Sequence, residues 1–506
     1  MTTQSRTKRN NRKCEQMLTA AEFLCSCLPV ADYPADELDA LWKKVLLNQF
    51  HDIIPGSSIH KVYENTEAEH AEVLKRCAAL IETAAEKLLR QEKDAVTVLN
   101  TLSYDYTSPV RLPDEWAGCS VTDESGREIL TQTENGALWA LGNFPPQSFT
   151  TLTRGKASGS VKAGVDKALV LENDLVRYEF DSDARLLRAF DKTANREVVC
   201  GAAGNLLGLY VDEPNNWDAW DVDFTYQDVP PVYVTGSRAE KVAAGPVRQV
   251  LEFELAVDKS KIRQQVVLAA NSKRLDFNTE VDWNEHHRML RVTFPTAIRA
   301  AEARCDIQYG YITRPTHRNT LWDFARFEVA AQRYVDIADA NGGAALLNDC
   351  KYGYKLLDGV LDLNLLRSPE NPDPEADLGH HSFTYSFLPH EGGLVGSEVI
   401  QEAACLNRAP LVLPGRSEAL MLPCRLVGGA GASLEVLKLA YKRDERIIRV
   451  VETDGCNSTA RLALEPGRKL VETNLVEWSS GMTLNQEDGV VEIPLKPFEI
   501  RTFRIR

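Results

Sequence analysis

Apolar residues recur at the three-to-four-residue spacing of amphipathic helices from about residue 9 to residue 93. Three such segments joined by short connections predict an antiparallel three-helix bundle. We expect the first helix to end near Pro29, the second to run from about residue 34 to 50, and the third from Ile59 to Leu88. Pro55 and Gly56 indicate a turn before the third helix, which Ser57 or Ser58 is placed to cap.

After Lys93 the pattern changes to alternation of apolar and polar residues, as in 176–180 and 251–257. Alternation predicts strands with one buried and one solvated face. The predicted fold class is α+β multidomain: an N-terminal three-helix bundle followed by mainly antiparallel β-sandwich domains. Small and turn-forming residues at 157–160 and 406–416 suggest the boundaries. The expected domains are 1–95 (bundle), 96–160 (small β-domain), 161–405 (large β-sandwich) and 406–506 (C-terminal β-sandwich).

Composition and charge narrow the classes of partner. The chain has 506 residues, 44% of them hydrophobic, and a formal net charge of −15. A strongly negative protein is a poor partner for nucleic acid or an anionic membrane, because both attract a basic surface. No apolar run is long enough to span a bilayer. We therefore expect neither nucleic acid nor a membrane as the main partner.

The first twelve residues and the cysteines indicate a compartment. Residues 1–12 are polar and basic, with no apolar segment behind them that would resemble a secretory signal. The eleven cysteines are odd in number and scattered, which does not match a disulfide framework. Reduced cysteines and a cytoplasmic location are the expectation.

The most informative segment is 48–58, at the predicted end of the second helix. His51 and Asp52 place an imidazole beside a carboxylate there. A His-Asp pair at a helix end is often only a polar terminus, although imidazole and carboxylate groups also serve as metal ligands and catalytic groups.

The run of residues 41–58, LWKKVLLNQFHDIIPGSS, resembles a signature segment of the glycoside hydrolase family 38 α-mannosidases. The resemblance implies that His51 is one of four ligands of a catalytic zinc and that Asp52 contacts the bound mannose. It also implies hydrolysis of terminal α-mannosyl residues of oligosaccharides with retention of configuration.

The resemblance extends from about residue 4 to the C-terminus, including segments 314–320 and 365–369. In that family an N-terminal α/β barrel supplies a His-x-Asp pair for zinc and the aspartate nucleophile. No histidine of this sequence is followed two residues later by aspartate, and no alternating βαβ pattern is present. The resemblance therefore implies the C-terminal portion of an α-mannosidase, with the catalytic barrel missing and no activity expected from this chain alone.

Two further groups of residues remain open to more than one interpretation. Residues 212–221 combine four acids with Trp217 and Trp220, which suits either sugar binding or a loop whose tryptophans close the sandwich edge. His380, His381 and His390 suggest a metal, but adjacent histidines on a strand point to opposite faces. Structural histidines or a rim around a sugar site are the alternatives.

Three hypotheses follow. The first is the mannosidase portion described above, acting on a mannose-containing oligosaccharide. The second is a non-catalytic carbohydrate-binding or scaffolding protein. The third is a subunit that completes the zinc site of a separately encoded catalytic barrel. In the resembled family the surface that carries His51 and Asp52 packs against the barrel. The resemblance therefore implies that this surface is exposed and apolar here, which would promote association and makes a homo-oligomer possible.

Overall fold

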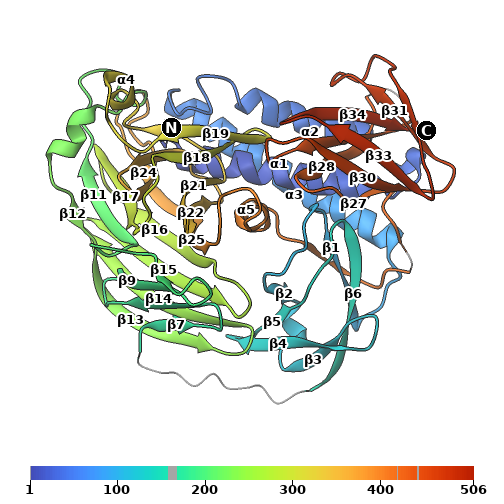
Figure 1. The fold of residues 1–506 in the computed structure, drawn as a ribbon, viewed down its shortest axis with the longest axis horizontal. Coiled ribbons are helices and arrows are strands. Elements are labelled where there is room, and N and C mark those ends of the chain that lie inside the picture. The colour runs from blue at the N-terminus through green and yellow to red at the C-terminus, as the bar shows by residue number, and fades with distance from the viewer. Residues whose placement is uncertain (1, 158–167, 419, 442–443) are drawn as a thin grey trace.

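The structure is a computed structural model that describes residues 2–157, 168–418, 420–441 and 444–506. Its first three helices form the predicted antiparallel bundle (Figure 1). They are α1 (Ser5–Cys25), α2 (Ala35–Asn48) and α3 (His60–Leu88). Leu18, Val45 and Val73 lie together in the core of the bundle, one from each helix. Apolar residues at helical spacing are therefore buried where the pattern predicts.

The start of α1 differs from the prediction, because the helix begins at Ser5 rather than near residue 9. Its first turns are polar yet buried. The Arg12 guanidinium, for example, donates to Asn348 Oδ1 at 3.1 Å and lies over the ring of Tyr352. A buried polar helix face gives no hydrophobic period, so the pattern begins only where α1 meets the other helices.

The first β-region is a seven-stranded antiparallel sheet next to the bundle. In spatial order its strands are β2 (Val110–Leu112), β5 (Ala137–Leu141), β4 (Glu128–Glu134), β3 (Cys119–Thr122), β6 (Ser148–Ala157), β1 (Ala95–Asn100) and β26 (Leu411–Pro414). β26 comes from far along the chain and pairs with β1, with Leu411 opposite Leu99. The sheet is thus completed by a late segment.

The largest region consists of three sheets that share one apolar core. The nine-stranded sheet has the order β13 (Thr235–Ala244), β14 (Arg248–Val257), β15 (Ser260–Ala269), β16 (Leu275–Trp283), β25 (Gly379–His390), β22 (Gly342–Asn348), β21 (Tyr334–Asp339), β18 (Glu302–Ile307) and β19 (Gly310–Pro315). The six-stranded sheet has β12 (Val232–Tyr233), β11 (Leu206–Val211), β17 (Arg288–Pro295), β24 (Val360–Arg367), β23 (Gly353–Leu357) and β20 (Val329–Ala330). The four-stranded sheet has β10 (Arg196–Glu197), β9 (Leu186–Asp191), β8 (Val176–Phe180) and β7 (Val170–Glu172).

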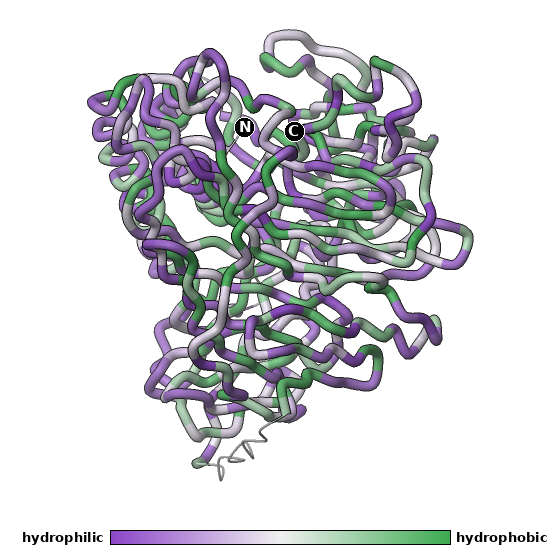
Figure 2. The backbone as a smooth tube through the Cα atoms, turned by 90° about the vertical axis from the view of Figure 1, so that its left-hand side faces the viewer, coloured by the Kyte–Doolittle hydropathy of each residue, from purple (hydrophilic) through white to green (hydrophobic). Residues whose placement is uncertain are grey.

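The alternation read from the sequence is the alternation of burial in this region. In β8 the residues Val176, Tyr178 and Phe180 are buried, whereas the residues between them are partly exposed. Hydrophobic and hydrophilic positions alternate in the same way along many strands of the tube drawing (Figure 2). Each sheet therefore turns one face to the shared core.

The C-terminal region is a second sandwich of two sheets (Figure 1). One sheet contains β27 (Cys424–Gly428), β30 (Ser458–Leu464) and β33 (Val490–Leu495). The other contains β28 (Ala432–Leu439), β29 (Arg446–Glu452), β34 (Ile500–Ile505), β31 (Lys469–Thr473) and β32 (Thr483–Asn485). Phe23 of α1 is fully buried in its core, so the bundle and this sandwich form one packed unit.

Short helices complete the described part of the chain. They are α4 (Leu321–Phe324), α5 (Val399–Asn407) and the 3₁₀ turns Val30–Asp32, Asp114–Trp116 and Phe224–Asp228. None of the described helices combines the length and the apolar character needed to cross a membrane. The α+β fold class is confirmed. Of the expected boundary at 157–160, residues 158–160 lie outside the described residues.

Candidate functional site

His51 and Asp52 lie in the turn that follows α2, and both face solvent. Their side chains are 74% and 47% exposed, with His51 Nε2 3.4 Å from Asp52 Oδ2. The imidazole also lies against the ring of Phe50, at 4.2 Å between centroids. The turn thus presents an imidazole and a carboxylate side by side, as the sequence indicates.

The backbone of this turn is held in place, although the side chains of His51 and Asp52 are exposed. The Lys8 ammonium donates to the carbonyl oxygen of Pro55 at 3.0 Å. Ser58 Oγ donates to the carbonyl oxygen of Asp52 at 2.7 Å, and α3 begins two residues later without a side-chain cap. The predicted capping role of Ser57 or Ser58 is therefore wrong, because the Ser58 hydroxyl stabilises the turn instead.

The turn rests directly on the segment before α1. Gly56 has φ 102°, and a Cβ at this position would lie 2.6 Å from the carbonyl oxygen of Thr3. Thr3 itself is fully buried. Glycine is required here both for its left-handed backbone and for the close approach of the two chain segments.

Beneath the turn lies a buried group of charged side chains from distant parts of the chain. The Ser5 amide donates to Asp377 Oδ1 at 2.6 Å, and the Lys351 ammonium donates to the Ser5 hydroxyl. Burial lowers the pKa of Lys8 and raises the pKa of Asp377. The position of the His51 turn is thus tied to the large β-region through the start of α1.

A second exposed element lies on the other side of Thr3, in the loop of residues 212–221. Trp217 and Trp220 are 74% and 59% exposed, so the interpretation in which they close the sandwich edge is wrong. The carbonyl oxygen of Ala219 accepts from the Thr3 hydroxyl at 3.5 Å. Thr3 therefore contacts both exposed elements, which places them at neighbouring positions on the surface.

The 212–221 loop is held by one buried guanidinium. Arg367 Nε donates to Asp212 Oδ2 at 2.6 Å, and neither side chain is more than 1% exposed. The same guanidinium donates to the carbonyl oxygens of Asp218, Ala219 and Asp221. Burial raises the pKa of Asp212 despite the neighbouring cation.

The sequence did not single out the polar groups beside this loop. His287 lies 3.6 Å from an Asp218 carboxylate oxygen and 3.4 Å from one of Glu370, which also lies 3.2 Å from His286. These groups come from the turn before β17 and the segment after β24, which are adjacent strands. The adjacent histidines His286 and His287 were the only sign of this group in the sequence. Their proximity to Glu370 follows from the pairing of β17 with β24, which are distant in the chain and which the sequence pattern does not pair.

The three histidines of β25 have separate environments. His380 is exposed, whereas His381 is buried and donates to the carbonyl oxygen of Asp377 at 2.7 Å. His390 is buried 2.6 Å from the carboxylate of Asp336. Adjacent residues do point to opposite faces, and the two buried histidines are structural, hydrogen-bonded side chains.

Four large apolar side chains within eight residues of His51 are exposed. Leu46, Leu47, Phe50 and Ile59 are each more than half exposed. They lie on the last turn of α2, in the turn itself and just before α3. We call these four residues the apolar rim; its exposure is unusual for side chains of this size and type and is typical of a surface that contacts another molecule.

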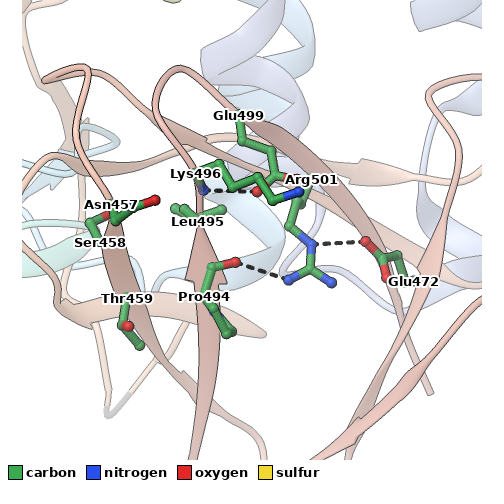
Figure 3. A pocket seen from close by; sticks show the side chains of 9 residues that line it. All are labelled: Asn457, Ser458, Thr459, Glu472, Pro494, Leu495, Lys496, Glu499 and Arg501. Atoms are coloured by element: carbon green, nitrogen blue, oxygen red, sulfur yellow. Dashed lines mark hydrogen bonds and ion pairs between the residues drawn. The ribbon is translucent and has the colours of Figure 1, made fainter.

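The described residues outside the His51 turn and the 212–221 loop add neither a metal cluster nor a second binding site with a free cation at its centre. Among the described residues, no three His, Cys, Asp or Glu side chains are grouped so that they could hold a metal ion. A hollow of about 740 Å³ lies elsewhere, in the C-terminal sandwich (Figure 3). Its Arg501 is already engaged by Glu472 at 2.8 Å and by the carbonyl oxygen of Pro494 at 3.0 Å. The Arg501 guanidinium of this hollow is therefore paired within the protein.

Comparison with known families gives three consecutive matches. Residues 1–88 match the "Alpha mannosidase middle domain", and residues 171–375 match the "Glycosyl hydrolases family 38 C-terminal domain". Residues 431–503 match the "Glycosyl hydrolases family 38 C-terminal beta sandwich domain". Together these segments include the bundle, most of the large β-region and most of the C-terminal sandwich.

Individual proteins give the same result. Alpha-mannosidase 2C1 of Homo sapiens is 33% identical over 99% of this chain and 49% of its own length. Alpha-mannosidase G of Dictyostelium discoideum is 33% identical over 99% of this chain and 51% of its own. The crystal structure of an alpha-mannosidase from Enterococcus faecalis V583 superposes with a TM-score of 0.81 at 18% identity, over 99% of this chain and 67% of that one. The chain thus spans about half the length of the curated relatives it matches.

Proposed function

Because this chain belongs to glycosyl hydrolase family 38, we propose that it is the bundle and β-sandwich portion of a zinc-dependent, retaining α-mannosidase. The reaction would be hydrolysis of terminal α-mannosyl residues of an oligosaccharide. The observation that carries the proposal is the fixed turn that exposes His51 and Asp52 beside the apolar rim. The eleven free cysteines are in keeping with a cytoplasmic setting.

We assign one zinc ligand to His51. Its imidazole is largely exposed and its turn is held from beneath, so the ring is available to a metal on the surface. One histidine provides too few ligands to retain zinc, for which three or four are usual. The remaining ligands and the nucleophile would come from a catalytic barrel outside these 506 residues, and these residues alone would be inactive.

We assign a sugar contact to Asp52. Its carboxylate is about half exposed and next to the proposed ligand. A carboxylate accepts strong, charge-assisted hydrogen bonds from sugar hydroxyls. Asp52 would therefore orient the terminal mannose relative to the metal held in part by His51.

The apolar rim is the surface on which we place the barrel. Leu46, Leu47, Phe50 and Ile59 are exposed on both sequence flanks of His51 and Asp52, so a partner that covers the rim would also contact these two residues. Without that partner, the same exposed surface would favour association of two copies of the chain.

The test is complementation in trans. The N-terminal half of a similar α-mannosidase, supplied as a separate polypeptide, should associate with this chain and give zinc-dependent hydrolysis of an aryl α-mannoside. His51→Ala should lose both bound zinc and turnover, with partial recovery at high zinc. Asp52→Asn should keep zinc and lose turnover, whereas His380→Ala, which changes another exposed histidine, should change neither.

Two results would contradict the proposal. Full zinc content in the associated His51→Ala pair would remove the ligand role. Turnover by the chain alone, clearly above that of His51→Ala, would show that the nucleophile lies within these residues.

A further inference from the structure

Trp217 and Trp220 combine large exposed apolar area with an ordered backbone. The Trp220 amide donates to the carbonyl oxygen of Trp217 at 2.7 Å, so both rings project from one tight turn. Trp217 has φ 58°, a left-handed conformation that is unfavourable for a residue with a large side chain. Strain of this kind persists only when surrounding contacts impose it, and it is commonly found at binding sites.

Those contacts are present on both sides of the turn. From below, the Arg367 guanidinium binds the carbonyl oxygens of Asp218, Ala219 and Asp221. From the side, the Asp218 carboxylate accepts the amides of Glu370 and Asn371 at 2.8 and 3.0 Å. The backbone that carries the two tryptophans is therefore fixed before any ligand binds, which lowers the entropy cost of binding.

Beside the rings lie groups that form hydrogen bonds with hydroxyls. His286 and Glu370 are each a little less than half exposed and form a pair at 3.2 Å. Carboxylate and imidazole groups accept and donate hydrogen bonds to sugar hydroxyls, while indole faces stack on the apolar C–H faces of pyranose rings. The same carboxylates would repel phosphate groups, which argues against nucleic acid or a phosphorylated ligand.

We propose that the 212–221 loop is a preformed binding platform for a neutral pyranose unit of an oligosaccharide, with Trp217 and Trp220 as its stacking residues. Its contact with Thr3, which also supports Gly56, places the platform beside the His51 turn. The inference rests on the proposed function in one respect only, namely that the bound pyranose belongs to a mannose-containing oligosaccharide. The platform would then hold a sugar unit adjacent to the terminal mannose.

The experiment measures binding by the full chain alone. Saturation-transfer NMR and calorimetry with α-mannobiose are performed in the presence of a chelator, so that zinc and a barrel play no part. The Trp217→Ala/Trp220→Ala variant should bind about tenfold more weakly than the unchanged chain, because two stacking faces are removed. Trp478→Ala is the matched control: Trp478 is equally exposed, at 74%, but lies in the C-terminal sandwich, and its removal should leave the affinity unchanged.

Absence of mannobiose binding by the unchanged chain would overturn the proposal, as would equal affinity in the double variant. If the double variant kept its affinity for mannobiose but no longer associated with the supplied barrel, the loop would be a contact for protein rather than for sugar. Failure of complementation leaves this test intact, because binding is measured without the barrel. Conversely, mannosidase activity in the pair combined with no tryptophan-dependent binding would reject only the platform.

Discussion

The His51 turn and the 212–221 loop use the same arrangement with different supports. Each exposes its distinctive side chains, and each has backbone carbonyl oxygens bound from beneath by a buried cation. Lys8 supports the first through the carbonyl oxygens of Pro55 and Thr3. Arg367 supports the second and is paired with buried Asp212. The comparison indicates that the supports stabilise both segments and leave the exposed side chains available for the binding roles that we propose.

Removal of the Arg367 guanidinium should lower the free energy of unfolding more than any other change considered below. Arg367→Met leaves the Asp212 carboxylate buried without its partner, and we expect the free energy of unfolding to fall by about 3–5 kcal/mol. Denaturant unfolding measures it. Arg111→Met is the control, since Arg111 forms an exposed pair with Asp114 and its loss should cost less than about 1 kcal/mol. A loss as small as the control's would mean that the loop does not depend on this cation.

The close contact under the His51 turn should come next. Gly56→Ala adds a Cβ 2.6 Å from the Thr3 carbonyl oxygen at a position with left-handed backbone. We expect the free energy of unfolding to fall by about 2–3 kcal/mol. Gly126→Ala separates the two causes, because Gly126 has φ 81° but no atom within 4 Å of the added Cβ. That variant should lose only about 1 kcal/mol. Equal losses would show that backbone conformation alone explains the requirement for glycine.

Removal of Lys8 should have a smaller effect that depends on pH. Lys8→Met removes the donor to the buried carbonyl oxygen of Thr3 and to the partly buried one of Pro55, and we expect the free energy of unfolding to fall by about 1–2 kcal/mol. Burial lowers the pKa of Lys8 from its ordinary value of 10.5 to about 7. Between these two values the unfolded state binds more protons than the folded state. The free energy of unfolding should therefore rise as the pH rises toward 10.5.

The predicted rise of the free energy of unfolding with pH can be measured directly. Urea unfolding at neutral and mildly alkaline pH should show the rise in the unchanged chain and a smaller rise in Lys8→Met. Lys43→Met is a suitable control, because Lys43 is exposed and paired with Asp39. A rise of the same size in both variants would place the responsible group elsewhere.

The sequence predicted what depends on local pattern and missed what depends on distant contacts. Alternation in 176–180 and helical spacing after residue 9 identified strands and helices, since burial follows a period of two or 3.6 residues. Ser5 and Arg12 gave no such signal, because their polar side chains are buried against residues more than 300 positions away. Lys8 gave none either, because its buried ammonium binds the carbonyl oxygen of Pro55 in the connection between α2 and α3. The arrangement of His287, Asp218 and Glu370 was also inaccessible, since pairing of β17 with β24 creates it.

The candidate site shows the same division between local and distant information. Resemblance within residues 41–58 identified His51 and Asp52, whose exposure follows from the turn after α2. It could not identify Arg367 as the residue that fixes the tryptophan loop, because that contact joins residues about 150 positions apart. The ligand and substrate roles of His51 and Asp52 remain predictions.

The smallest expected effect is also the sharpest test of the comparison. His51→Ala and Asp52→Asn change side chains that are 74% and 47% exposed and that leave the supporting hydrogen bonds intact, because Lys8 and Ser58 bind backbone oxygens. We expect the free energy of unfolding to change by less than about 0.5 kcal/mol in each variant. Thermal and denaturant unfolding would show it. If His51→Ala instead destabilised the chain as much as Gly56→Ala, the imidazole would be part of the support, and its exposure could no longer be taken as a sign of function.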